Sequence, residues 1–461
     1  MKTMKTIRRL LSITSLVYCL SLSFNFSTAS AQTKSFTVPK LSAEALRKDI
    51  SALRDTLVAM HPGIYRYKSK VYFNHIFDSC YSAIRDSMPV TKFYTLTSRL
   101  IGAIEDGHTN CRLPRQLQND YLNNVKVFPA IVYFIANKTY LLCCKQNDGL
   151  AESELIAIDG QPISKIKSEM FGRIPSDGSI KSRKNWELNN DFYLLYNCLY
   201  GEKSSFKVTY KTKSGEIKTS VLQADLLKNM VCMNLRDNIS QYLKLEYKPG
   251  NVAVMTIKTF FDGFLDRTKE NFDKFLAESF KALKDKKIEK LIIDIRNNGG
   301  GNDGNGIKLY AYLTQKPFRY YASQETVKEK FAEANHPNLQ MQNPETDNFK
   351  GKVYVLINGR SFSAAAEFPA VVRSNNRGIF IGEETGGGYY GNTSGGDKDI
   401  TLPNSQITAR IPLVKYTSAV KKAKYPDRGI IPDYTIYPTV TDFIQHKDVQ
   451  LEYTLKLAGS K

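Results

Sequence analysis

The sequence predicts an α/β protein in which a helical N-terminal region and a small β-rich module precede an α/β core. Apolar residues recur at helical spacing before residue 118, and short β-type runs follow up to residue 225. From residue 251 onward, strands alternate with helices, which is typical of βαβ units. We therefore divide the chain into a helical region (32–117), a β-rich module (118–225), a core (226–440) and a C-terminal tail (441–461).

The first 31 residues have the pattern of a secretory signal peptide. A basic start precedes an apolar stretch from Leu10 to Phe26, and Ala29-Ser30-Ala31 has the small-x-small spacing of a cleavage site. We predict cleavage after Ala31, which leaves Gln32 as the first mature residue. No later stretch approaches the ~20 apolar residues of a membrane helix. The mature chain is therefore predicted to be periplasmic or secreted, without a transmembrane segment.

The chain has 461 residues and a formal net charge of +20. A charge of this sign can indicate nucleic-acid binding. However, the Lys and Arg residues are spread along the chain, and no dense basic run is interleaved with aromatic residues. We interpret the charge as a solvated basic surface and predict no nucleic-acid partner.

Six cysteines remain after the predicted cleavage, and none belongs to a Cys-x-x-Cys pair or a cluster with zinc-finger spacing. We therefore predict no metal site, and no motif implies an organic cofactor. An exported protein can form disulfides, but the sequence leaves their pairing open, and free buried thiols are an equal alternative. The six are Cys80, Cys111, Cys143, Cys144, Cys198 and Cys232.

The helical region ends in a short polar motif that contains one of the five histidines of the chain. Leu46, Ile50, Leu53 and Leu57 form one apolar stripe of a first helix, and Thr91 can cap a third. That third helix ends at Asp106-Gly107-His108-Thr109, where Gly107 is a natural stop signal. His108 is therefore predicted at a helix end. The other histidines lie in contexts that predict turns, loops or charged stretches, including the turn His61-Pro62-Gly63.

The β-rich module is predicted from short runs such as Thr139–Cys143 and Ser205–Tyr210. A tight Asp159-Gly160 turn joins two further strands. The single tryptophan, Trp186, lies in a polar stretch that we interpret as a loop or linker.

The core contains a glycine-rich loop directly after a predicted strand. Residues 251–257 and 291–296 are predicted strands, and an amphipathic helix spans 267–283 between them. The second strand runs into Asn297-Asn298-Gly299-Gly300-Gly301. This loop lacks both the spacing and the Lys-Ser/Thr of nucleotide-binding motifs. Bare backbone N–H groups that approach a substrate carbonyl fit an oxyanion hole, and a flexible turn is the alternative.

A second strand-to-helix junction contains a candidate nucleophile. The apolar run Val353–Ile357 predicts a buried strand, and Ser361-Phe362-Ser363 leads into the helix-favouring Ala364–Glu367. A serine at such a junction lies beside the free N–H groups of the helix, which favour developing negative charge. An ordinary N-cap is the alternative interpretation of this serine.

Taken together, these segments resemble the tail-specific, or C-terminal-processing, serine peptidases. The resemblance rests on four motifs in chain order and covers about residues 41–437. They are Asp106–Thr109, Ile158–Pro162, Asp294–Gly300 and Ser361–Glu367, with support from Gly382–Gly387 and Gly429–Asp433. The resemblance implies a crotonase-like α/β core with an inserted PDZ-like module at residues 118–225. It also implies that Ser363 is the nucleophile and that Ala364 and Gly299 or Gly300, preferably Gly300, form the oxyanion hole.

One departure from the family pattern concerns the catalytic base. A Ser–Lys branch carries its lysine after the Gly-Glu motif, where this chain has Gly388, and residues 382–396 contain no lysine. The chain instead resembles the branch of the tricorn core and interphotoreceptor retinoid-binding protein, whose catalytic members use a histidine. His108 matches that base, and its unperturbed pKa lies near neutrality. The family's acid aligns with Pro426, so Asp427 and Asp106 are the two candidates for the orienting group.

The sequence therefore predicts an exported serine endopeptidase that acts on proteins or peptides. A non-catalytic ligand- or peptide-binding protein with the same fold is the alternative, because fold alone does not determine function. An esterase-type hydrolase with the same Ser–His pair is a second alternative. The oligomeric state stays open.

Overall fold

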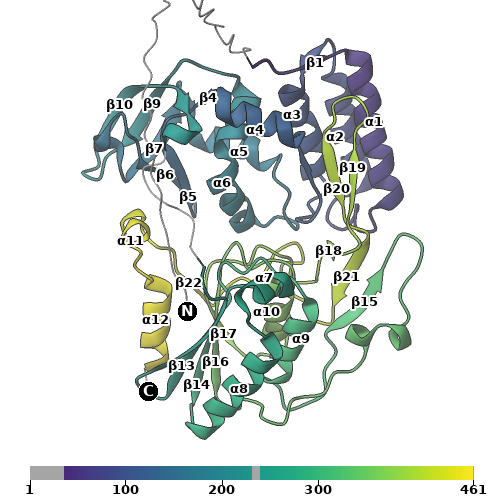
Figure 1. Cartoon of the computed structure of the whole chain (residues 1–461), viewed down its shortest axis with the longest axis vertical. Helices are drawn as coiled ribbons and strands as arrows, with labels where there is room; N and C mark the ends of the chain where they lie inside the picture. The colour runs from purple at the N-terminus through teal and green to yellow at the C-terminus, as the bar shows by residue number, and fades with distance from the viewer. Residues whose placement is uncertain (1–35, 231–238, 460–461) are drawn as a thin grey trace, which may run out of the picture. The chain divides into compact units, whose positions relative to one another are not determined.

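The structure is a computed structural model that describes residues 36–230 and 239–459. The predicted signal peptide and Cys232 lie outside the described residues. Val38 and all later described residues belong to one compact unit. Figure 1 shows how the helices and strands of this unit are arranged. None of the helices in the described residues is long and apolar enough to cross a bilayer.

The N-terminal region is built from three helices around one apolar core. They are α1 (Ala43–Met60), α2 (Lys70–Ser82) and α3 (Val90–Gly102), and the short strands β1 (Lys40–Leu41) and β2 (Met88–Pro89) pair beside them. The predicted stripe of α1 is confirmed, since Leu46, Ile50, Leu53 and Leu57 are all fully buried. The N-cap of α3 is Pro89, not the predicted Thr91.

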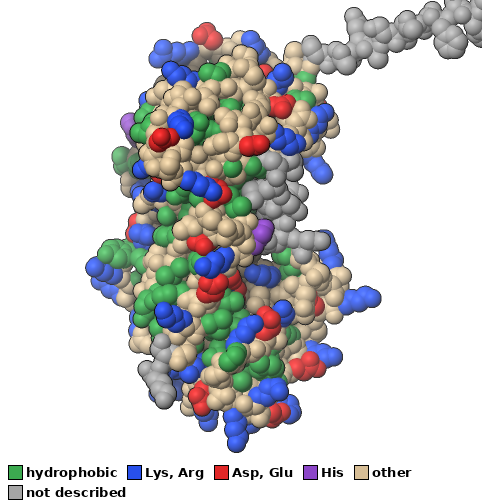
Figure 2. All heavy atoms as spheres, turned by 90° about the vertical axis from the view of Figure 1, so that its left-hand side faces the viewer, with side chains coloured by type: hydrophobic (Ala, Val, Ile, Leu, Met, Phe, Trp, Pro, Cys, Tyr) green, Lys and Arg blue, Asp and Glu red, His purple; other side chains and the backbone are tan. Residues whose placement is uncertain are grey.

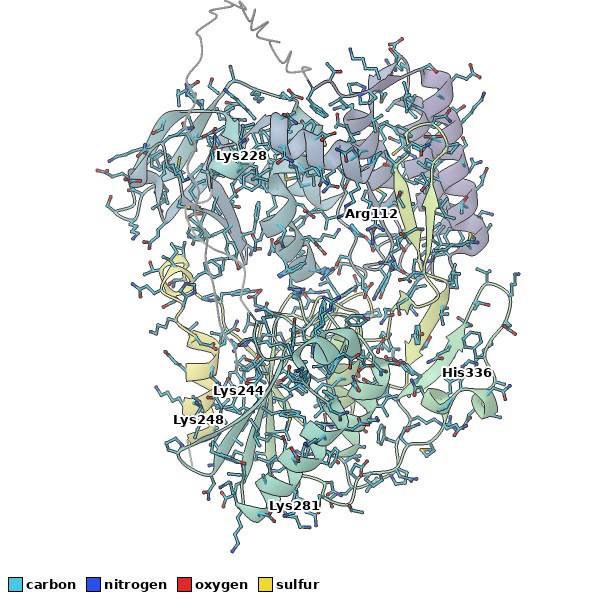
Figure 3. All side chains as sticks on the ribbon, in the orientation of Figure 1. Arg112, Lys228, Lys244, Lys248, Lys281 and His336 are labelled. Carbon is cyan, nitrogen blue, oxygen red and sulfur yellow. The ribbon has the colours of Figure 1, made fainter. Side chains whose placement is uncertain are left out.

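A hairpin from near residue 400 completes this N-terminal core. β19 (Lys398–Thr401) and β20 (Thr408–Ile411) pair with each other, and β20 pairs with β3 (Asn110–Arg112). Leu402 and Ile407 pack in the same cluster as the helices. Arg112, labelled in Figure 3, pairs with Asp399 at 2.8 Å across this sheet. Segments about 300 residues apart in sequence therefore share one core.

The β-rich module is an antiparallel sheet in the order β10-β9-β7-β6-β5, with helices packed on it. Trp186 lies in the 20-residue helix α6, so its prediction as part of a loop or linker is wrong. The signal was present, because Leu188, Phe192 and Leu195 recur at helical spacing and are buried. The elements are α4 (Arg115–Asn124), β4 (Lys126–Val127), β5 (Ile131–Ile135), β6 (Lys138–Cys143), β7 (Ser153–Ile158), β8 (Gln161–Pro162), α5 (Ile163–Phe171), α6 (Lys181–Tyr200), β9 (Ser205–Lys211), β10 (Ile217–Gln223) and β11 (Asp225–Leu226).

The core is a six-stranded sheet in the order β12-β13-β14-β16-β17-β22. All neighbours from β13 to β22 are parallel, and only β12 is antiparallel. The predicted helix at 267–283 is two helices, α7 and α8, because Lys269 adopts a left-handed conformation between them. The elements are β12 (Leu243–Lys248), β13 (Val252–Ile257), α7 (Asp262–Thr268), α8 (Phe272–Asp285), β14 (Lys290–Asp294), α9 (Asp303–Ala311), β16 (Lys352–Ile357), α10 (Ala364–Ser374), β17 (Ile379–Gly382) and β22 (Tyr434–Thr435).

Both faces of this sheet are covered. Met255 and Ile293 belong to the cluster that contains residues of α8, α9 and α10, whereas Val254 and Ile292 belong to the cluster on α12 (Val449–Gly459). This alternation explains why Val252–Met255 of β13 and Leu291–Ile293 of β14 are apolar at successive positions. The residues assigned to a C-terminal tail thus form α11 (Val440–Ile444) and α12, and α12 packs on the core sheet. A smaller sheet joins β15 (Tyr321–Glu325), β21 (Val414–Ser418) and β18 (Thr393–Ser394).

The thiols and the charged surface complete the description. Cys143 is disulfide-bonded, while Cys80, Cys111, Cys144 and Cys198 are free. On the face that Figure 2 shows, Lys and Arg side chains are scattered among Asp and Glu side chains and form no single basic patch.

Candidate active site

Ser363 occupies a strained backbone position between β16 and α10. It is the N-cap residue of α10, with φ 57° and ψ −132°. A positive φ is uncommon for a residue other than glycine and costs about 1–3 kcal/mol. Its side chain makes no capping hydrogen bond, so the hydroxyl is not used as an ordinary N-cap. A strained serine at a strand-to-helix turn is instead an arrangement that can present a nucleophile.

The neighbouring serine has a structural role. Ser361 is completely buried, and its Oγ donates to the carbonyl of Ile295 at 2.9 Å and accepts from the N–H of Asn358 at 3.1 Å. These bonds join the ends of β14 and β16. Ser363 is half-buried and its Oγ makes no hydrogen bond within the described residues. Of the two serines, only Ser363 is available to a substrate.

Two backbone N–H groups near Ser363 make no hydrogen bond in the described part of the chain. One belongs to Ala364, in the first turn of α10, and the other to Gly299. The N–H of Gly300 donates to Asn298 Oδ1 at 2.8 Å, so the geometry favours Gly299 over the predicted Gly300 as the second donor. Gly300 is needed for another reason. A Cβ at this position would lie 2.7 Å from the carbonyl oxygen of Phe362 and from Ser363 Cβ.

His108 lies against the residue that precedes Ser363. Its ring stacks on Phe362 with 4.4 Å between ring centroids. Burial lowers the pKa of His108 to about 4, although the charge of Asp106 opposes this shift. The imidazole is therefore neutral and able to accept a proton at neutral pH. No hydrogen bond joins Ser363 Oγ to His108 within the described residues, and such catalytic bonds commonly form only with substrate bound.

Asp106 is buried and holds the backbone of its own loop. Its Oδ1 accepts the N–H groups of His108 at 2.8 Å and of Thr109 at 3.3 Å. Burial raises the pKa of Asp106, but the hydrogen bonds from His61 and from the backbone of His108 outweigh burial and lower this pKa to about 2. Asp106 is therefore ionised and fixes the shape of the His108 loop through backbone bonds.

His61 is a member of this site that the sequence interpretation missed. Its Nδ1 accepts the N–H of Gly63 at 3.0 Å, so we assign the ring proton to Nε2. Nε2 donates to Thr109 Oγ1 at 2.7 Å and lies 3.2 Å from Asp106 Oδ2. The turn at His61 was predicted correctly, but its contact with a residue 48 positions away has no signal in the sequence.

Asp427 is not brought to His108 through its carboxylate. Its backbone carbonyl accepts the N–H of Ser179 at 2.9 Å, and its side chain makes no hydrogen bond among the described residues. Asp177, which lies between α5 and α6, is a further buried acid beside this loop that the sequence interpretation did not single out. It is 1% exposed and accepts the N–H of Gly107 at 2.8 Å and of Gly388 at 3.0 Å. An Asp-Gly pair in a loop normally predicts only a turn, so nothing local indicated this role.

Hydrogen bonds hold the glycine-rich stretch after β17 in place. Glu384 receives two hydrogen bonds from Arg428, both at 2.6 Å, and Thr385 Oγ1 accepts the N–H of Ile430 at 2.8 Å. Gly388 and Gly429 form a β-bridge. The motifs around residues 382–388 and 429–433 thus stabilise each other. They also fix the position of Gly388, whose N–H donates to Asp177.

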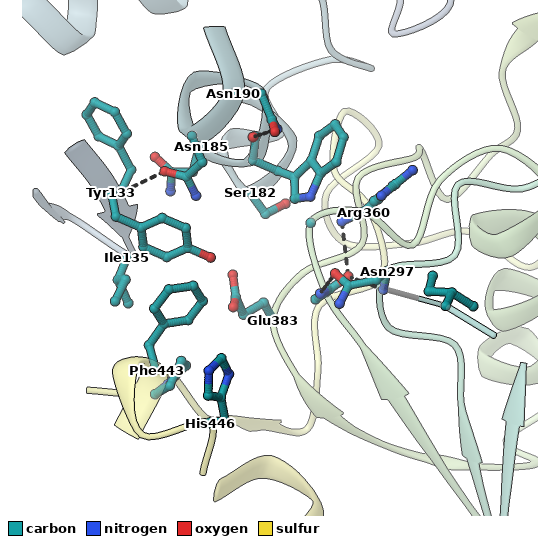
Figure 4. Close-up of a pocket in the computed structure, with 17 residues that line it drawn as sticks. Tyr133, Ile135, Ser182, Asn185, Asn190, Asn297, Arg360, Glu383, Phe443 and His446 are labelled. Atoms are coloured by element: carbon teal, nitrogen blue, oxygen red, sulfur yellow. Dashed lines mark hydrogen bonds between the residues drawn. The ribbon is translucent and has the colours of Figure 1, made fainter. Parts of the chain in front are cut away.

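A pocket of about 530 Å³ adjoins the loops that carry Gly299 and Ser363. Figure 4 shows side chains from β5, α6, the two core loops and the segment 438–446 around it. Arg360 lies over the ring of Trp186 at 4.6 Å on one side. Tyr133 and Phe443 stack at 4.2 Å on another side. Burial raises the pKa of Glu383, which also lines the pocket, to about 7. The pocket is thus polar and aromatic, and large enough for a side chain of a peptide.

The family comparison can now be placed on this geometry. The family described as Peptidase family S41 matches residues 251–436. Residues 251–436 are thus similar to the S41 peptidase domain. The matched residues contain Ser363, Ala364 and the Gly299 loop, but they include neither His108 nor Asp177. The predicted relationship to the C-terminal-processing serine peptidases is confirmed through this domain.

Individual relatives support the same relationship. A tail-specific protease from Haemophilus influenzae is 27% identical over 242 residues, which are 50% of this chain and 30% of that protein. The chain thus spans less than a third of the relative that it matches. The crystal structure of mature CPAF has a TM-score of 0.60 at 14% identity and covers 90% of this chain and 97% of that one. The structure of mature CPAF complexed with lactacystin also has a TM-score of 0.60 at 14% identity, and the match covers 90% of this chain and 98% of that one. These two structures show that the fold is shared.

Proposed function

We propose that this protein is an exported serine endopeptidase that hydrolyses peptide bonds of proteins or peptides, with Ser363 as the nucleophile and His108 as the base. The observation that carries this proposal is the strained conformation of Ser363 beside two N–H groups without partners. Cutting near the C-terminal tails of substrates is a further part of the proposal, because the S41 domain and the tail-specific relative point to it.

The proposed reaction follows the general scheme of acyl transfer. Ser363 Oγ attacks the peptide carbonyl carbon while His108 accepts the Oγ proton. The N–H groups of Ala364 and Gly299 stabilise the oxyanion, and each such donor is worth about 10²–10³ in rate. His108 then gives its proton to the leaving amine as the C–N bond breaks. A water molecule, activated by the same imidazole, hydrolyses the acyl-enzyme and frees Ser363.

The proposal extends to the parts of the chain. We propose a crotonase-like core at residues 226–440 and a PDZ-like module at 118–225 that binds substrate tails. The parallel strands with helices on both faces support the first assignment. The small antiparallel sheet with packed helices supports the second. Export after cleavage near Ala31 is the corresponding proposal for the location.

The experiment that tests this function is labelling of the mature protein with a fluorophosphonate, followed by mapping of the modified residue. We expect the label on Ser363, its loss in Ser363→Ala and strongly slowed labelling in His108→Gln. Cleavage of casein and of tail peptides, compared with a simple ester, then separates a peptidase from an esterase. Label on Ser361 would overturn the assigned nucleophile.

The alternative is a binding protein with the same fold. It is favoured by one observation, the absence of a hydrogen bond to His108 Nδ1 within the described residues. A folded protein that takes no label, hydrolyses neither peptide nor ester and still binds peptides would establish this alternative.

A further inference from the structure

We propose that Asp177 is the positioning residue of this active site, the carboxylate that orients His108 and stabilises its imidazolium form. The inference rests on the proposed Ser363–His108 mechanism, because Asp177 acts only through His108. It assigns a role to a residue of the β-rich module, which lies outside the matched S41 residues. The module would then complete the catalytic site as well as contact substrate.

The first argument is the surroundings of the His108 ring. Its Nδ1 is buried and has no hydrogen-bond partner in the described part of the chain. One ring nitrogen and one carboxylate oxygen each from Asp106 and Asp177 lie within 4.8 Å of one another. A buried ring nitrogen without a partner is costly, and a small rotation toward a carboxylate would relieve that cost. A neutral imidazole that accepts a proton at Nε2 must carry its own proton at Nδ1, where the acid is needed.

The second argument excludes the other two acids. Asp106 already accepts two backbone N–H groups at Oδ1, and its Oδ2 lies 3.2 Å from His61 Nε2, whereas each oxygen of Asp177 accepts only one backbone N–H. Asp427 contacts the Ser179 segment through its backbone. Asp177 is the remaining carboxyl group near the ring. It comes from a loop that the sequence interpretation placed inside the module.

The third argument is that Asp177 is held rigidly at the required place. One of its oxygens accepts the N–H of Gly107, next to His108, and the other accepts the N–H of Gly388. A Cβ at Gly388 would lie 2.8 Å from the hydroxyl of Tyr67 and 3.5 Å from Asp177 Cβ. A side chain at residue 388 would therefore require Tyr67 to shift, and Asp177 lies in contact on the same side. A carboxylate fixed from both sides loses little entropy when it holds a histidine.

The charges around Asp177 determine the expected pH dependence. Burial raises the pKa of Asp177 to about 7, and the negative charge of Asp106 adds to this shift. His108 is already neutral at pH 7, because its pKa is about 4. Asp177 therefore gains a proton first as the pH falls, and the imidazolium then loses its stabilising charge. The titratable or charged groups that interact with Asp177 are Asp106, Arg66, Tyr67 and Glu367, and His108 lies beside it.

The proton balance of the step is simple. The Oγ–H proton of Ser363 moves to His108 Nε2 as the Oγ–C bond forms. The Nδ1 proton stays on the ring and donates to the ionised carboxylate of Asp177, which itself takes up no proton. When the C–N bond breaks, the Nε2 proton goes to the leaving amine. Asp177 thus stabilises the charge on the ring and keeps the required tautomer.

The experiment compares Asp177→Asn with Asp159→Asn in the full mature protein. Asp159 is a matched control, because it lies in the same module and also accepts a backbone N–H, that of Lys207 at 2.8 Å. For Asp177→Asn we expect kcat to fall by about 10²–10⁴ with KM within about twofold. We also expect a change in the acid limb of the pH profile, which is the fall of kcat/KM toward acidic pH. Its midpoint lies near pH 7 in the wild type and should move to lower pH in the variant. Asp159→Asn keeps both the rate and the limb. A lower rate with an unmoved limb would reduce Asp177 to a structural role and overturn the proposal.

A measurement on the wild-type protein avoids any folding defect of the variant. The chain has five histidines, so ¹³Cε1-labelled histidine gives few resonances, and His108→Gln assigns one of them. We expect the His108 resonance to shift with a step near pH 7, caused by the ionisation of Asp177. The absence of a step between pH 6 and 8 would overturn the inference. If the step is present but the wild type takes no fluorophosphonate, the His108–Asp177 pair stands and the peptidase proposal fails.

Discussion

The Ser363 half and the His108 half of the candidate active site are held by different interactions. Around Ser363 the important groups are backbone atoms of two strand-to-loop junctions, and all of them lie within the S41 domain. Around His108 they are buried side chains from distant parts of the chain. The bond from Gly107 to Asp177 spans 70 residues, and the bond from Gly388 to Asp177 spans 211.

The two halves are held differently because they have different chemical tasks. The nucleophile needs a fixed direction and N–H donors for the oxyanion, which a strand, a turn and a helix can supply locally. The base needs a tuned proton affinity, which requires burial and charges placed by tertiary structure. Substitutions in the Ser363 half should therefore act through geometry, and those in the His108 half through charge and stability.

The largest expected effect separates the two serines. Ser363→Ala removes the attacking oxygen and should lower kcat by about 10⁴-fold or more. Ser361→Ala keeps the attacking oxygen but removes the bonds of its hydroxyl to the partly buried N–H of Asn358 and the carbonyl of Ile295, which should cost about 1–3 kcal/mol of unfolding free energy. Single-turnover kinetics and urea unfolding measure the two effects. Equal loss of kcat in a folded Ser361→Ala protein would contradict the assignment.

The next effect tests the backbone geometry of the Ser363 half. Gly300→Ala places a Cβ 2.7 Å from Ser363 Cβ at a φ of +92°, so it should displace the nucleophile and lower kcat by about 10²–10³. Gly299→Ala is the matched control, because its Cβ would meet nothing closer than Arg360 Nε at 3.7 Å and its N–H is kept. We expect kcat within about threefold for that control. If Gly299→Ala lowered kcat more than Gly300→Ala does, the close contact with the nucleophile would lie at Gly299 instead.

A smaller effect is expected in the support of the His108 loop. His61→Ala leaves the N–H of Gly63 and the carboxylate of Asp106 with one partner fewer, which should lower the free energy of unfolding by about 3 kcal/mol. The exposed His75 of α2 provides the control, since His75→Ala should change this free energy by less than about 0.5 kcal/mol. Urea unfolding at pH 7 measures both values. Unchanged stability in His61→Ala would show that the network adds nothing to the fold.

The smallest expected effect concerns the contact between the halves. The guanidinium of Arg183 lies 4.2 Å from the ring of Phe362, on which His108 stacks, and its charge helps to lower the pKa of His108. Arg183→Ala should lower kcat/KM by about three- to tenfold, in line with a cation–π contact of about 1 kcal/mol. Arg112→Ala, in an exposed ion pair, should leave kcat/KM unchanged. A loss above 100-fold would indicate that Arg183 contacts the substrate directly.

Much of the Ser363 half could be predicted from the sequence. The strand expected at Val353–Ile357 is β16 (Lys352–Ile357), and the helix expected after Ser363 is α10. These elements are recognisable because an apolar run, a turn and a small helix-favouring run follow one another in the chain. Hydrogen bonds that follow from local packing, such as that of Gly300 to Asn298, were still beyond prediction.

The His108 half was predicted only in part. His108 and Asp106 belong to one short motif, so the sequence could single them out together. His61 and Asp177 could not be found in this way, because nothing local distinguishes them from residues of ordinary turns. The role of α12 on the core sheet was missed for a related reason, since its helix is short and lies in a segment with few other signals.

The sequence by itself thus determined the α/β class, the family relationship, and the strand and helix that flank the candidate nucleophile Ser363. These features depend on the order of neighbouring residues, which local sterics and hydrophobic periodicity convert into strands, turns and helices. Tertiary structure alone brought Asp177 and His61 to the loop that carries His108. The pairing of buried polar groups depends on distant segments meeting in a medium of low polarity, where every unpaired group is costly.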